Sequence, residues 1–134
     1  AMVDDWQVST IDNDLPPHVW DYLKKEKFWG LSIAKQYGGL GFSPYAHSTI
    51  VCKIATRSLT AAVTVMVPNS LGPAELIYHY GTEAQKNYYL PRLANGQDIP
   101  CFGLTSPTAG SDAGSINDFG IVCKQMIDGK EVLG

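Results

Sequence analysis

The spacing of the apolar residues changes near residue 99, and this change constrains the fold more than any other feature. Before Gly96, apolar side chains recur every three or four residues between helix-ending glycines and prolines. Over Pro100–Thr105 the side chains alternate between two faces, which is typical of a strand. We therefore expect a mainly α chain, with a helical bundle domain over residues 1–98 and the first strands of a β domain over residues 99–134.

Prolines, glycines and small polar residues indicate where the first helices begin and end. Asp14–Pro17 is expected to begin one helix, and the glycine-rich run Gln36–Gly41 is expected to be a turn, because so many glycines destabilise a helix. Ser43 and Pro44 then begin a helix, as cap and first-turn residue. Its apolar and small face is expected to continue at intervals of four through Ile50, Ile54, Ser58, Ala62 and Met66.

Two shorter helices are expected between residues 72 and 96. The first begins at Gly72-Pro73, has Leu76, Ile77 and Tyr80 on its inner face, and ends at Gly81 in the usual glycine position. The second begins with the capping box Thr82-Glu-Ala-Gln85 and has the apolar stripe Tyr89, Leu90 and Leu93. Pro91 lies inside this second pattern and is expected to kink or split the helix.

The C-terminal part of the chain is expected to be β structure. Pro100–Thr105 and Ile121–Ile127 are predicted strands, with a loop rich in small residues over Ser106–Ser115. Asp128-Gly129 predicts a hairpin turn into a further strand at Lys130–Leu133. Two or three strands are marginally stable alone, so we expect the sequence to be a fragment in which a sheet is incomplete.

The composition is that of an ordinary globular protein, with 45% hydrophobic and 17% charged residues among 134. The net charge of −3 argues against a nucleic-acid partner, and the one dense basic cluster, Lys24, Lys25 and Lys27, is interrupted by Glu26. We find no signal peptide and no membrane-spanning run, and we predict a cytoplasmic protein, with peripheral association at the inner membrane left open. The odd number of widely spaced cysteines (Cys52, Cys101 and Cys123) predicts reduced, buried thiols.

The candidate binding segment runs from Cys101 to Ser115. Its small residues could bring backbone N–H groups close to a phosphate, Thr105 and Ser111 add hydroxyls, and Phe102 and Leu104 offer apolar surface to a ring. The spacing matches neither a P-loop nor a dinucleotide fingerprint, so on residues alone a structural turn is favoured. No catalytic residue and no metal ligand are predicted, because His18, His47 and His79 lie on separate helices and fit surface or capping roles.

Three motifs, in order along the chain, resemble the acyl-CoA dehydrogenase family: Tyr37-Gly-Gly-Leu-Gly41, Tyr80–Gly96 and Leu104-Thr-Ser-Pro-Thr-Ala-Gly-Ser-Asp112. The resemblance implies an N-terminal helical domain, a β-barrel-like middle domain and a C-terminal helical bundle. It also implies FAD as cofactor, between the middle and C-terminal domains.

By position in the family motif, Phe102 and Leu104 would lie along the isoalloxazine of FAD, and Thr105 would hydrogen-bond the flavin ring. Gly110 and Ser111 would approach the FAD pyrophosphate, and Ser111 would also contact the acyl-CoA substrate. The helices around residues 60–76 would line the acyl-chain pocket.

The family usually has Glu after the threonine that corresponds to Thr105, where the chain has Ser106. Serine at this position resembles the Gram-negative bacterial β-oxidation type of the family. The resemblance implies a fatty acyl-CoA substrate, a trans-2-enoyl-CoA product, electron-transfer flavoprotein as electron acceptor, and a homo-oligomeric full-length form. The family's catalytic Glu belongs to the C-terminal domain, so the chain by itself is expected to be inactive.

Two alternatives remain open. The first is a relative on the same scaffold, an acyl-CoA oxidase or a flavin monooxygenase, which differs in how reduced flavin meets oxygen. The second is a non-catalytic helical interaction module, which predicts a complete fold at Gly134 and no affinity for flavin.

Overall fold

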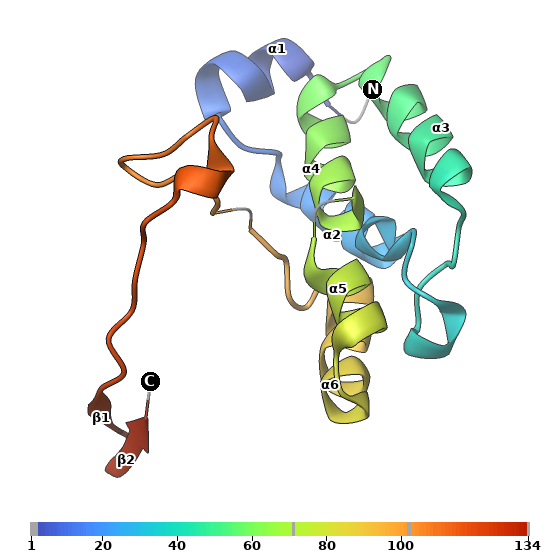
Figure 1. The fold of residues 1–134 in the computed structure, drawn as a ribbon. Helices are drawn as coiled ribbons and strands as arrows, with labels where there is room; N and C mark the ends of the chain where they lie inside the picture. Colours follow the sequence, from blue (N-terminus) through green and yellow to red (C-terminus); the bar gives the residue numbers. More distant parts are fainter. Residues whose placement is uncertain (1–2, 71, 102, 134) are drawn as a thin grey trace. The chain divides into compact units, whose positions relative to one another are not determined.

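The computed structural model describes residues 3–70, 72–101 and 103–133 (Figure 1). The chain divides into two compact units, Ala1–Phe102, which is helical, and Gly103–Gly134, which holds a loop and a hairpin. This confirms the expected fold class, mainly α with short C-terminal strands, while the domain boundary between residues 98 and 99 stays a prediction. None of the helices in the described residues combines the length and the apolar character needed to cross a membrane.

The helical unit is built from short helices joined by tight turns. Its elements are α1 (Asp5–Gln7), the π-helical η1 (Val8–Asp12), α2 (Pro17–Lys25), the 3-10 turns η2 (Phe28–Gly30) and η3 (Lys35–Tyr37), α3 (Pro44–Ala55), α4 (Leu59–Ser70), α5 (Pro73–Tyr80) and α6 (Glu83–Ala94). The second unit holds η4 (Ala113–Ser115), β1 (Lys124–Ile127) and β2 (Lys130–Leu133).

Helices α3 and α4 are separate where the sequence predicts one continuous helix from Ser43 to Met66, so that prediction is wrong (Figure 1). Ser58 lies in the break between them. Its Oγ accepts a hydrogen bond from the Ala61 N–H at 3.0 Å and donates one to Asp5 Oδ1 at 2.6 Å. Ser58 therefore caps α4 and connects it to α1, a role that only a residue outside the helix can fill.

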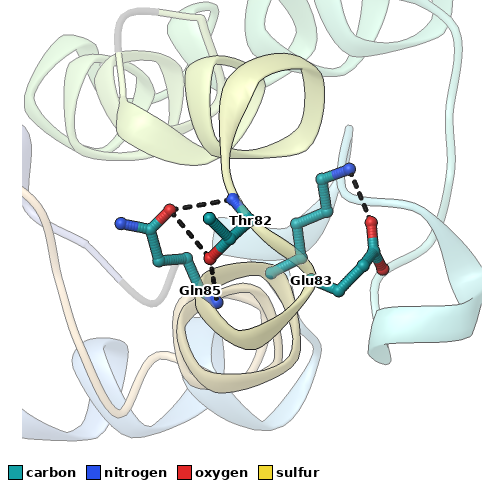
Figure 2. Close-up of polar contacts among 4 residues, drawn as sticks. Thr82, Glu83 and Gln85 are labelled. Atoms are coloured by element: carbon teal, nitrogen blue, oxygen red, sulfur yellow. Dashed lines mark hydrogen bonds and ion pairs between the residues drawn. The ribbon is translucent and has the colours of Figure 1, made fainter.

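The beginning of α6 confirms the predicted capping box, as Figure 2 shows. The Thr82 N–H donates to Gln85 Oε1 at 2.8 Å, and the Gln85 N–H donates to Thr82 Oγ1 at 3.2 Å. Glu83 in the same turn forms an ion pair with Lys86 at 2.9 Å. The helix continues through Pro91 as one element, so the proline does not split it.

Helix α5 has the predicted bounds but turns a different face inward. Leu76 and Tyr80 are 63% and 85% exposed, so their predicted inner position is wrong, whereas Ala74 is buried and Ile77 half-buried. Gly81 ends the helix with φ −71°, not in the left-handed conformation of the usual glycine cap. Glycine is needed there because a Cβ would lie 2.5 Å from the Ile77 carbonyl oxygen.

The unit has two apolar clusters. The first consists of Val8, Leu15, Val19, Leu23, Trp29, Leu31, Ala61 and Val65, and the second of Ile33, Tyr37, Ala74, Leu90, Leu93 and Ala94. The ring of Trp20 stacks on that of Trp29 in the first cluster, with centroids 5.5 Å apart and planes 9° from parallel. The turns around η2 connect the two clusters, because residues 29 and 31 belong to the first and residue 33 to the second.

Asn69, near the end of α4, connects that helix to the η2 turn. Its Nδ2 donates to the carbonyl oxygens of Phe28 at 2.7 Å and Val65 at 2.9 Å. Its Oδ1 accepts from the Ser32 N–H at 3.3 Å, and Ser32 Oγ donates to the Asn69 carbonyl oxygen at 3.2 Å. One side chain thus holds both ends of the turn against α4.

In the second unit, β1 and β2 form an antiparallel hairpin in the register Lys124↔Leu133. Asp128 and Gly129 both have positive φ, 50° and 76°, as the predicted two-residue hairpin turn requires. The strand predicted at residues 100–105 is absent from its described residues, and the one predicted from Ile121 begins only at Lys124. A strand needs a partner for its N–H and C=O groups, and only the hairpin supplies one among the residues described.

The cysteines differ from the prediction. Cys52, Cys101 and Cys123 are free thiols as expected, but all three are exposed, so their predicted burial is wrong. Apolar neighbours in sequence do not determine which face of an element packs. Cys52, for example, lies on an exposed side of α3 although the adjacent Val51 packs against the core.

Candidate functional site

The loop that follows residue 103 is closed by Ser106. The Ser106 N–H donates to the Ala109 carbonyl oxygen at 3.0 Å, and the Ala109 N–H donates to Ser106 Oγ at 3.1 Å. Both residues are 7% exposed. Ser106 therefore has a structural role, because its hydroxyl fixes the turn that leads to Gly110.

Asp112 orders the next part of the loop. Its Oδ1 accepts from the Gly114 N–H at 3.1 Å, and its Oδ2 accepts from Ser115 Oγ. These bonds begin the short helix η4 and occupy the Ser115 hydroxyl. Ser115, unlike Ser111, is thus already engaged within the protein.

The predicted ligand residues of this loop face solvent. Leu104 is 46% exposed, and Thr105, Gly110 and Ser111 are exposed, while Phe102 lies outside the described residues. The hydroxyls of Thr105 and Ser111 have no partner among the residues described. A Cβ built on Gly110 would lie 3.9 Å from Thr105 Cγ2, so the structure brings these two residues together with space beside them. Such a surface can offer hydroxyl and backbone donors to an anionic or ring-bearing ligand.

A second concave feature lies in the helical unit, between α5, α6 and the chain after η2. It is a cavity of about 240 Å³ that includes Ile33, Ala74, Glu75, His79 and Leu90 in its wall. The sequence does not predict this cavity, because its wall comes from three separate segments. The only local signal is the i, i+4 spacing of Glu75 and His79, which places both side chains on one helix face.

The three histidines have different environments. His18 and His79 are exposed, as predicted, but His47 is buried at 8% exposure, so the surface or capping role predicted for it is wrong. Its Nε2 has no hydrogen-bond partner within the described part of the chain, and burial lowers the pKa of this imidazole. His47 therefore stays neutral to lower pH than an exposed histidine.

Arg92 and Asp98 form a two-point ion pair after α6. Arg92 Nε donates to Asp98 Oδ2 at 2.6 Å, and Nη2 donates to Oδ1 at 2.9 Å. The hydrogen bonds from Arg92 lower the pKa of Asp98, and those to Asp98 raise the pKa of Arg92. The pair fixes the turn that follows Asn95-Gly96, and no predicted ligand residue belongs to it.

Comparison with known proteins gives a consistent answer. The family model described as "Acyl-CoA dehydrogenase, N-terminal domain" matches residues 2–97. The chain is 35% identical to the human mitochondrial very long-chain specific acyl-CoA dehydrogenase over 97 residues (72% of the chain), and 30% identical to an acyl-CoA dehydrogenase of Bacillus subtilis over 122 residues (90%). It is also 36% identical to the 3-(aryl)acrylate reductase of Clostridium sporogenes over 104 residues (77%).

These alignments cover 15%, 32% and 27% of the respective relatives, so the chain spans about a third or less of the curated relatives it matches. The match of residues 2–97 corresponds to the helical unit built from α1 to α6. The chain belongs to the acyl-CoA dehydrogenase family, through the N-terminal domain of that family.

Proposed function

We propose that this chain is the N-terminal part of an FAD-dependent acyl-CoA dehydrogenase that converts a fatty acyl-CoA to a trans-2-enoyl-CoA in β-oxidation. The observation that carries the proposal is the family match over residues 2–97, followed by the exposed loop at residues 103–115. Residues 99–134 are the beginning of the middle β domain in this proposal. Electron-transfer flavoprotein is the electron acceptor, and the full-length protein is a homo-oligomer.

The loop residues fit FAD chemically. Leu104 and Thr105 would lie along the flavin ring together with Phe102, and Gly110 and Ser111 would hold the pyrophosphate, with Ser111 also contacting acyl-CoA. Two features support the fit. The hydroxyls of Thr105 and Ser111 have no hydrogen-bond partner among the described residues, and there is open space beside Gly110. When bound, FAD supplies an acceptor for two electrons, while the chain's part is to bind and orient.

The proposed base of the reaction is a carboxylate of the C-terminal domain, outside residues 1–134. Binding and orientation without a placed base do not give the reaction. We therefore expect the 134-residue chain to show no acyl-CoA dehydrogenase turnover and at most weak affinity for FAD. Measurable turnover by the purified chain would overturn this part of the proposal.

The test uses the full-length protein that contains this sequence. Its visible spectrum is recorded before and after addition of a long-chain acyl-CoA under anaerobic conditions. A yellow protein that bleaches supports the proposal, and rapid reoxidation of the flavin in air would instead favour an oxidase or monooxygenase. A colourless protein that FAD cannot reconstitute would refute the proposal and favour a non-catalytic interaction module.

Two serines of the loop provide a matched pair of variants. Ser111→Ala removes a hydroxyl without a described partner and should weaken FAD or acyl-CoA binding by about tenfold, as loss of a hydrogen bond to a charged ligand does. Ser115→Ala removes a hydroxyl that already serves Asp112, so binding should change by less than about twofold. Equal effects of the two changes would argue against the assigned role of Ser111.

A second candidate is reduction in the opposite direction. The chain is as similar to the 3-(aryl)acrylate reductase of Clostridium sporogenes (36%) as to the human dehydrogenase (35%). Identity therefore does not distinguish the two directions. Reoxidation of the photoreduced full-length protein by an α,β-unsaturated acid or its CoA thioester, without bleaching by acyl-CoA, would favour the reductase.

A further inference from the structure

The cavity in the helical unit has an apolar floor. Ile33, Ala74 and Leu90 line it and are only 5%, 7% and 1% exposed, so they form a fixed surface of the second apolar cluster. The cavity volume is about 240 Å³. For comparison, an engineered apolar cavity of roughly 150 Å³ holds a benzene molecule. The present cavity thus has room for a ring and a small head group.

The rim of the cavity carries one carboxylate. Glu75 Oε1 lies 2.9 Å from His79 Nε2, and the side chains of the two residues are 72% and 54% exposed. Glu75 Oε2 has no partner among the described residues. One oxygen of the carboxylate is therefore available to a ligand that carries hydrogen-bond donors or positive charge.

An aromatic ring lies beside this carboxylate. Tyr78 lines the cavity and is 43% exposed, so part of its ring is open to a ligand. Its position is held by edge contacts with Tyr37 at 6.4 Å and His79 at 5.3 Å between centroids. A ring face attracts a cation within about 6 Å of its centre, and the same attraction underlies the recognition of quaternary ammonium ligands by aromatic cages.

We propose that this cavity binds an organic ammonium ion with an apolar body. The body lies on Ile33, Ala74 and Leu90, and the ammonium head lies between the Glu75 carboxylate and the Tyr78 ring. The cavity belongs to the helical unit and the loop of the proposed function to the second unit, and this proposal does not depend on FAD.

Two lysines are close enough to affect the preference for a cation. Lys86 already forms an ion pair with Glu83 at 2.9 Å, so its charge is compensated. Lys35 lies beside the rim, where a Cβ on Gly41 would lie 3.4 Å from Lys35 Cγ. Its ammonium should oppose a bound cation, so Lys35→Gln should strengthen cation binding about twofold.

The experiment titrates the isotope-labelled 134-residue chain with three probes of similar size and records amide NMR shifts. The probes are benzyltrimethylammonium, the neutral benzyl alcohol and the anionic phenylacetate. We expect shifts centred on Ile33, Ala74 and Leu90, and about tenfold tighter binding of the ammonium probe than of the other two. Equal affinity of the three probes, or shifts centred elsewhere, would overturn the proposal.

Variants test the two recognition groups separately. Glu75→Gln should weaken binding of the ammonium probe about threefold, and Tyr78→Leu about two- to fivefold, with benzyl alcohol nearly unchanged. Glu26→Gln is the matched control, because it removes the same charge from an exposed residue at the end of α2 that does not line the cavity. An equal loss with Glu26→Gln would mean that net charge, and not the site, attracts the cation.

Discussion

Replacing Asn69 by Ala should destabilise the helical unit, because the Asn69 side chain connects α4 to the η2 turn. The change removes the hydrogen bond to the Phe28 carbonyl at 2.7 Å and the one from the Ser32 N–H at 3.3 Å, which hold the η2 turn against the helix. It also removes the bond to Val65 within α4. Water can replace these partners only in part, because the bonds are half-buried.

The expected magnitude follows from the two bonds that leave the helix. At about 1 kcal/mol for each hydrogen bond, and with two backbone groups left poorly satisfied, the loss is about 2 to 3 kcal/mol. For a unit of this size, 1 kcal/mol corresponds to about 4–8 °C in Tm, so Asn69→Ala should melt about 8–24 °C lower.

Urea denaturation followed by circular dichroism at 222 nm measures this difference. The midpoint should fall while the slope m stays constant, as for a two-state change in stability. Ser70→Ala is the control, because Ser70 Oγ donates only to the Met66 carbonyl of the same helix and is exposed. It should cost less than about 0.5 kcal/mol. If Asn69→Ala costs no more than this control, Asn69 does not hold the turn.

Two further predictions concern α6 and the turn that follows it. Gly30→Ala should lower the free energy of unfolding, measured by urea denaturation, by about 1–3 kcal/mol, because the new Cβ would lie 2.9 Å from the Ala94 carbonyl oxygen. A loss below about 0.5 kcal/mol would mean that the backbone shifts to make room for the Cβ. Because Arg92 lowers the pKa of Asp98, this carboxylate contributes stability above its unfolded pKa of about 4, and that contribution is lost as pH falls through the lowered folded pKa. Asp98→Asn should therefore lower the free energy of unfolding at pH 7 and flatten the loss of stability below about pH 4. Salt should reduce both effects, because the two side chains of the pair are about a third exposed. An unchanged pH profile would contradict this.

The site could be predicted only in part. The loop at residues 106–115 was predicted from its small residues, and the structure confirms that it is a loop. The bond from the Ala109 N–H to Ser106 Oγ was not predicted, because composition does not reveal which hydroxyl is used within the loop. The roles assigned to Thr105, Gly110 and Ser111 stay predictions from the family resemblance.

Local signals in the sequence determined the elements whose hydrogen bonds close within four residues. The capping box of Thr82 and Gln85, the start of α3 after Ser43 and the hairpin turn at Asp128-Gly129 all formed as predicted. Each depends on a side chain or backbone conformation that acts on its nearest neighbours, so distant segments cannot easily change it.

The tertiary structure decided what depends on partners far along the chain. Ser58 lies between α3 and α4 and caps α4, and its hydroxyl donates to Asp5, 53 residues earlier in the chain. Leu76 faces solvent and Ala74 faces the core because α5 packs on α6 and on Ile33 in that orientation. Apolar spacing shows that a helix has faces, but only the segments that pack against it determine which face is buried.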